Sequence, residues 1–120
     1  PAGVRRLLDV LLPQIPASQL AGHFHDTYGM AIANIVAAME CGLATFDSSV
    51  AGLGGCPYAQ GASGNVATED VVWLLNGLGV ECGVSLEALL DASALISGFL
   101  GKPPASRVAR ALLAKRGSEQ

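Results

Sequence analysis

Residues 19–29 read QLAGHFHDTYG, and this stretch decides the expected fold. A short, largely apolar run ends in His23 and His25, and Asp26 follows where a helix can begin. This pattern predicts a strand over residues 19–25. Side chains two positions apart on a strand point to the same face, so both imidazoles are expected together at the carboxyl end of the strand. Open α/β sheets bind their ligands at that end.

Helices and strands are expected to alternate on both sides of this stretch. The predicted elements are a helix over 3–12, a helix over 28–41 that is apolar nearly all round, a strand over 43–50, a glycine-rich loop over 51–64, and helices that begin at Asn65 or Thr68, at Ser85 and at Ser106. A buried helix between two strands is typical of a parallel βαβ unit. Parallel strands are covered on both faces, so further strands are expected from outside this sequence or from another molecule.

The composition argues against several classes of partner. The 120 residues are 51% hydrophobic and 14% charged, with a formal net charge of −3. They suffice for one globular domain but carry too few basic groups for nucleic-acid binding through phosphate neutralisation. Polar residues interrupt every apolar run before the roughly 20 residues that a bilayer span needs, so no membrane is expected. Three cysteines without a secretory leader indicate a reducing compartment, and the start at Pro1 indicates a piece of something larger.

His23 and His25 form a candidate metal site. A single histidine on a strand is more often a core residue, but two imidazoles beside Asp26 would crowd one small volume, which favours metal ligation. Nitrogen and oxygen donors without thiolate suit Mg²⁺, Mn²⁺ or Zn²⁺. Asn65 is a further candidate ligand through its amide oxygen, and the alternative is that it caps the following helix.

The glycine-rich loop over 51–64 carries Cys56 outside any periodic apolar stripe. A thiol there is chemically available, whereas Cys41 and Cys82 fit the role of small buried hydrophobes. The glycines allow the loop to fold over a ligand or to form a phosphate nest, and they match no nucleotide-binding fingerprint. Loops of this length without structure of their own are usually functional.

Acidic residues flank this loop on both sides. Glu69 and Asp70 fall in the first turn of the next helix, where acids ordinarily complement the helix dipole. Glu69 follows Asn65 by one helical turn, so the two are expected to share a face. Asp47 and the two serines after it end the second strand, and they are candidates to support metal ligands by hydrogen bonds.

Three segments together resemble the carboxyl-terminal part of hydroxymethylglutaryl-CoA lyase: HFHDTYG at 23–29, DSSVAGLGGCPYAQGASGN at 47–65 and ATEDVVWLL at 67–75. The resemblance continues in register over nearly the whole chain. It implies an α/β fold made of the last two strand–helix units of a TIM barrel and a helical tail. Residues 1–80 would form the barrel units, and residues 81–120 would form the helical appendage.

The resemblance implies a divalent cation, Mg²⁺ or Mn²⁺, held by His23, His25 and Asn65. The family's remaining protein ligand, its catalytic arginine and most of its coenzyme A site would lie outside this sequence. The implied partners are therefore an acyl-CoA substrate and the amino-terminal part of the barrel, and a homo-oligomer is expected. The implied location is the cytoplasm in a bacterium and the mitochondrion in a eukaryote.

The implied reaction cleaves 3-hydroxy-3-methylglutaryl-CoA into acetyl-CoA and acetoacetate, a step of leucine degradation and ketone-body formation. Cys56 matches the catalytic cysteine of the family, and a loop thiol is suited to protonate the enolate that cleavage leaves. His23 is expected to take part in proton transfer. Glu69 and Asp70 match acidic residues that influence catalysis near the metal.

Two other functions stay open. One is a related metal-dependent aldolase or acyl-CoA synthase with the same His-x-His pattern, which the cysteine of the glycine-rich loop argues against. The other is an inactive barrel piece stabilised by association, because missing strands would leave apolar faces uncovered. Little or no activity is expected from the isolated 120-residue chain.

Overall fold

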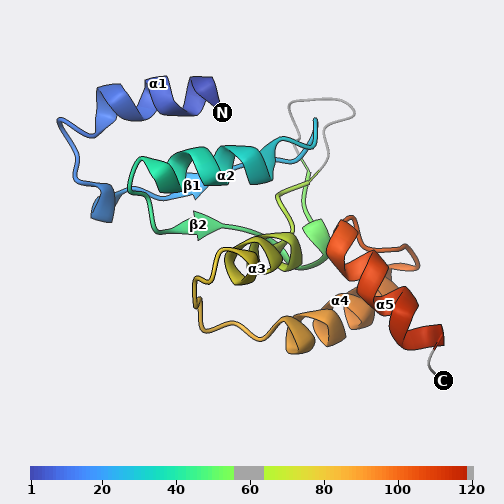
Figure 1. Cartoon of the computed structure of the whole chain (residues 1–120). Coiled ribbons are helices and arrows are strands. Elements are labelled where there is room, and N and C mark those ends of the chain that lie inside the picture. The colour runs from blue at the N-terminus through green and yellow to red at the C-terminus, as the bar shows by residue number, and fades with distance from the viewer. Residues whose placement is uncertain (56–63, 119–120) are drawn as a thin grey trace.

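The computed structural model describes residues 1–55 and 64–118 of the chain. Within these ranges a helix, a strand, a second helix and a second strand are followed by three further helices, as Figure 1 shows. Two short 3-10 turns, η1 (Ala17–Gln19) and η2 (Val50–Gly52), lie between them. Cys56 and the middle of the glycine-rich loop fall outside the described residues.

The centre of the fold is one parallel βαβ unit. β1 (Gly22–His23) pairs in parallel with β2 (Phe46–Asp47), and α2 (Ala31–Glu40) is the crossover between them. The predicted parallel pairing is confirmed. Both strands are shorter than the predicted residues 19–25 and 43–50, because each has a single parallel neighbour among the described residues and the ladder between them is short.

Two buried clusters form the core on this unit. The first joins α2 to the chain after the glycine-rich loop, and the second joins α2 to α1 (Ala2–Leu11). The buried members are Ala31, Ile35, Val66 and Val71 in the first cluster, and Leu8, Ala38 and Leu43 in the second. The predicted burial of the second helix is confirmed for its inner residues. On α1, Leu8 is buried, whereas the neighbouring Leu7 is 58% exposed.

Three helices follow the glycine-rich loop: α3 (Thr68–Gly77), α4 (Leu86–Leu100) and α5 (Arg107–Ser118). α4 begins as predicted after Ser85, whose Oγ accepts a hydrogen bond from the Ala88 N–H at 3.3 Å. It ends at Gly101, where φ is +63°, a left-handed conformation that glycine adopts without steric cost. No helix of the described residues is long and apolar enough to cross a membrane.

The tail helices pack against the start of α3 and the base of the glycine-rich loop. α4 and α5 contact each other and α3, and α4 also contacts η2. In Figure 1 they form a layer at the end of the molecule farthest from α1. α4 and the chain just before α5 therefore lie against the segment from which the glycine-rich loop begins.

Candidate metal centre

The chain that leaves the glycine-rich loop runs between the ends of β1 and β2. Asn65 forms an antiparallel bridge with His25, and the Val66 N–H donates to the Phe24 carbonyl at 3.1 Å. On the other side, the Ser49 N–H donates to the Val66 carbonyl at 3.0 Å. Backbone hydrogen bonds therefore hold Asn65 beside the two histidines, although it lies far from them in the sequence.

This pairing replaces the predicted helix cap. α3 begins at Thr68 with Ala67 at its N-cap position, and no side chain caps it. The interpretation of Asn65 as an N-cap is therefore wrong. The expectation that Asn65 and Glu69 share a helix face also fails, because Asn65 belongs to the bridge with His25 and not to the helix.

The two imidazoles lie side by side, as their spacing predicts. The ring centroids of His23 and His25 are 5.3 Å apart, and the ring planes are inclined by 53°. His23 sits at the open end of β1 with 55% of its side chain exposed, and His25 is half-buried. A metal ion about 2.0–2.1 Å from one nitrogen of each ring is compatible with this separation.

Asp47 holds one of these rings from the neighbouring strand. Its Oδ2 lies 3.2 Å from His23 Nδ1, and the parallel register places the two residues opposite each other. When Nδ1 carries the proton and donates it to Asp47, Nε2 keeps its lone pair for a metal ion. Ser48 is directed elsewhere, since its Oγ lies 2.8 Å from Thr68 Oγ1 at the start of α3.

The side chain of Asn65 is oriented by the first residues of the glycine-rich loop. Its Nδ2 donates to the Leu53 carbonyl at 3.1 Å, and Oδ1 accepts no hydrogen bond from the described residues. A cavity of about 170 Å³ opens beside Asn65, and Asp26, Asp70 and Arg107 also line it. Asp26 is itself engaged at the start of α2, where its Oδ1 accepts from a backbone N–H at 2.9 Å.

Glu69 does not lie in the solvent as an ordinary first-turn acid would. It is fully buried, and both of its carboxylate oxygens accept from the Ala51 N–H, at 2.9 and 3.1 Å. Among the described residues these hydrogen bonds go to η2 and not to the histidines. Glu69 therefore contacts the base of the glycine-rich loop.

Asp70 is likewise engaged by the chain itself. Its Oδ1 accepts from Ser106 Oγ at 2.7 Å and from the Val108 N–H at 3.0 Å. The Ser106 hydroxyl in turn accepts from the Ala109 N–H at 2.9 Å, which caps α5. The carboxylate therefore fastens the start of α5 to α3, a role that no local pattern in the sequence indicates.

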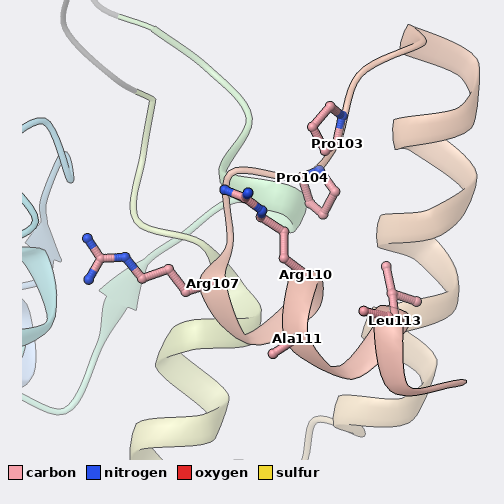
Figure 2. A pocket seen from close by; sticks show the side chains of 7 residues that line it. Pro103, Pro104, Arg107, Arg110, Ala111 and Leu113 are labelled. Atoms are coloured by element: carbon pink, nitrogen blue, oxygen red, sulfur yellow. The ribbon is translucent and has the colours of Figure 1, made fainter. Parts of the chain in front are cut away.

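Arg107 is a residue that the sequence analysis missed. It lies at the start of α5 and reaches the cavity beside Asn65. Figure 2 shows Arg107 and Arg110 extending in different directions from this helix, with Arg110 turned toward Pro104. The pocket in Figure 2, of about 620 Å³, belongs to the tail and shares only Arg107 with the cavity beside Asn65.

The donor set fits a divalent cation bound by mixed nitrogen and oxygen ligands. It offers two adjacent imidazoles and, beside them, an amide with a free oxygen. Within residues 1–55 and 64–118, no three side chains of His, Cys, Asp or Glu come close enough to hold a metal ion.

A parallel βαβ unit with metal-binding residue types at the carboxyl ends of its strands is found both in α/β barrel enzymes and in open α/β sheets. A family model described as HMGL-like matches residues 1–96. The chain belongs to this family.

Similar proteins carry lyase names. The 3-hydroxy-3-isohexenylglutaryl-CoA/hydroxy-methylglutaryl-CoA lyase of Pseudomonas aeruginosa is 60% identical over 111 residues, which make up 92% of this chain and 37% of that protein. The mitochondrial hydroxymethylglutaryl-CoA lyase of Homo sapiens is 50% identical over 92% of this chain and 34% of its own length. The chain thus spans little more than a third of the length of these relatives.

Solved structures of lyases superpose closely on the described residues. The hydroxymethylglutaryl-CoA lyase from Pseudomonas aeruginosa gives a TM-score of 0.91 at 59% identity, over 95% of this chain and 38% of that chain. The lyase from Acinetobacter baumannii in complex with coenzyme A and 3-methylmalate gives a TM-score of 0.87 at 40% identity. This match covers 92% of this chain and 36% of that chain. The resemblance to hydroxymethylglutaryl-CoA lyases is confirmed, and the architecture is that of a part of such a lyase.

Proposed function

We propose that the chain is the carboxyl-terminal part of a metal-dependent hydroxymethylglutaryl-CoA lyase. Residues 1–80 would supply the last two strand–helix units of its TIM barrel, and residues 81–120 a helical appendage. The observation that carries this proposal is the placement of His23, His25 and Asn65 together at the ends of the parallel strands, in a chain whose relatives carry this name. The remaining strands, a carboxylate ligand and most of the acyl-CoA site would come from the rest of the protein.

In this proposal His23, His25 and Asn65 hold Mg²⁺ or Mn²⁺. A divalent cation there would supply Lewis-acid chemistry that lowers the pKa of a substrate hydroxyl. Asp47 keeps His23 in the tautomer that presents Nε2. The Leu53 carbonyl keeps Asn65 turned so that Oδ1 is available.

Two residues are proposed to move protons. With Nε2 on the cation, the proton of His23 Nδ1, which faces Asp47 near the open end of β1, is the one that this ring can exchange. Cys56 is proposed to protonate the carbon of the acetyl-CoA enolate. The start of the loop that carries Cys56 supports this assignment, because the Leu53 carbonyl there accepts a hydrogen bond from Asn65 at the candidate metal centre.

The substrate class is a 3-hydroxy-3-substituted glutaryl thioester of coenzyme A. One relative is named for both the methyl and the longer isohexenyl compound, so both are candidate substrates. With the methyl compound the complete protein is expected to release acetyl-CoA and acetoacetate in equal amounts, measured by liquid chromatography. Chelation of divalent metal should abolish product formation, and added Mg²⁺ or Mn²⁺ should restore it.

Variants of the complete protein test the assigned residues. Cys56→Ala is expected to lower turnover by about 10²- to 10⁴-fold, the range of a general acid, while Mn²⁺ binding stays unchanged. His25→Ala and Asn65→Ala are expected to weaken Mn²⁺ binding instead. Product formation that survives chelation, or Mn²⁺ binding indifferent to both ligand variants, would contradict the proposed function.

A further inference from the structure

Ala51 adopts a backbone conformation that L-residues with a Cβ rarely adopt. Its φ is +58° and its ψ is +10°, and no other residue except glycine has a positive φ within the described ranges. This left-handed conformation is sterically disfavoured for alanine and persists only where surrounding interactions hold it. Ala51 begins the glycine-rich loop, so whatever holds it also sets the direction in which the loop leaves the second strand.

Hydrogen bonds hold Ala51 at both its N–H and its carbonyl. Its N–H donates to both carboxylate oxygens of Glu69, and its carbonyl accepts from the Ala105 N–H at 2.9 Å. Glu69 is fully buried and Ala51 is 3% exposed, so water does not replace either bond. A buried carboxylate from α3 and the chain before α5 therefore hold the two peptide units on either side of the Ala51 Cα.

The clamped turn is connected directly to a candidate metal ligand. η2 leads into Leu53, whose carbonyl accepts from Asn65 Nδ2 at 3.1 Å. A Cβ at Gly64 would collide with the carbonyl oxygens of Gly52 and Gly54, so the two ends of the loop lie in direct backbone contact. A shift of the turn would therefore rotate or displace the amide of Asn65.

We propose that Glu69 is a positioning residue that orients Asn65 Oδ1 toward the metal by holding the left-handed turn at Ala51. The inference rests on the proposed function, because it takes Asn65 as a metal ligand. It assigns Glu69 no contact with substrate, which agrees with its complete burial. Ala105 holds the same turn from the opposite side, so the helical tail contributes to the same positioning.

The test measures Mn²⁺ affinity in the complete protein by electron paramagnetic resonance. Glu69→Met fills a similar volume without an acceptor, and it is expected to weaken binding at least about tenfold, as loss of a group that orients a ligand does. Glu69→Gln keeps one acceptor for the Ala51 N–H and is expected to restore most of the affinity. In an Asn65→Ala background, Glu69→Met should change the affinity by less than about twofold, because the ligand that it orients is absent.

A matched control separates positioning from loss of stability. Val72→Ala alters another buried side chain of α3, 2% exposed, and should lower the melting temperature without changing Mn²⁺ affinity. If Glu69→Met does not fold, Ala105→Pro removes the second bond to Ala51 and is expected to weaken Mn²⁺ binding. Wild-type affinity in Glu69→Met, or in a folded Ala105→Pro protein if Glu69→Met does not fold, overturns the inference. Wild-type affinity in Asn65→Ala instead overturns the proposed metal centre.

Discussion

At the residue scale, the candidate metal centre depends on groups that orient its ligands. Asp47 faces His23 across the strand pair, and the Leu53 carbonyl faces the amide of Asn65. Each orienting bond uses one polar atom of a candidate ligand, and the other polar atom has no hydrogen bond to residues 1–55 or 64–118. The geometry therefore specifies which atom of each side chain is available to a cation.

Asp47 provides a direct prediction at this scale. Asp47→Ala removes the acceptor for His23 Nδ1, and Mn²⁺ affinity of the complete protein is expected to fall about 10- to 100-fold. Asp47→Asn keeps an acceptor without the charge, and its Mn²⁺ affinity should lie between those of Asp47→Ala and the wild type. The exposed Asp9 on α1 offers a control, and Asp9→Ala should leave the affinity unchanged. Equal affinities for Asp47→Ala and wild type would show that the hydrogen bond does not support the site.

At the element scale, close packing decides how β1 meets β2. A Cβ on Gly22 would lie 2.7 Å from Phe46 Cδ1 and 2.9 Å from Phe24 Cε2, so two aromatic rings occupy the space that a side chain would need. Glycine is required here by close approach and not by its backbone freedom. The same contact keeps the strands in the register that aligns His23 with Asp47.

Gly22→Ala is therefore expected to lower the free energy of unfolding by about 1–3 kcal/mol through overpacking. Gly98→Ala is the matched control, since it lies within α4 and nothing is within 4 Å of its Cβ position. That variant should be stabilised by about 0.5–1 kcal/mol, because alanine is the better helix former. Urea unfolding of the complete protein measures both changes. Equal effects of the two substitutions would refute the packing argument.

The hydrogen bonds that attach the start of α5 to Asp70 of α3 are a second feature at the element scale. Asp70→Ala removes the acceptor of two hydrogen bonds, from Ser106 and Val108, and is expected to lower the free energy of unfolding by about 1–3 kcal/mol. Amide hydrogen exchange should accelerate in α5 more than in α2. Asp91→Ala, which removes an exposed ion pair with Arg116, should change stability by no more than about 1 kcal/mol. Unchanged exchange in α5 after Asp70→Ala would exclude the fastening role.

At the scale of the whole molecule, the described surface carries several large apolar side chains that are mostly exposed. Leu95 and Phe99, one helical turn apart on α4, are 78% and 85% exposed, and Val10 of α1 is 62% exposed. Exposed apolar groups of this size promote association between chains. The parallel strands also lack neighbours on their outer edges among the described residues.

The 120-residue chain produced alone is therefore expected to self-associate and to show little or no lyase activity. Analytical ultracentrifugation should give species heavier than the 12.2 kDa of one chain. The complete protein, at the same molar concentration, is the control and should turn over substrate with added Mg²⁺. A monodisperse 12.2 kDa chain with activity near that of the complete protein would contradict this expectation.

The sequence by itself determined the features that arise from local spacing. The order of strand and helix follows from the period of the apolar residues, the start of α4 follows from Ser85, and the adjacency of His23 and His25 follows from their separation by one residue. Each depends on backbone geometry within a few residues. The strand lengths were overestimated, because pairing depends on neighbours that local spacing does not specify.

Only the tertiary structure decided the contacts between distant segments. It placed Asn65 beside His25 instead of at a helix cap, buried Glu69 against Ala51, and joined Asp70 to Ser106. The physical reason is that a polar side chain can form similar hydrogen bonds with many different partners. Its neighbours in the sequence are therefore equally compatible with a helix cap, a metal ligand or a contact to a distant segment. The return path of the chain after the glycine-rich loop selects the partner and thereby the role.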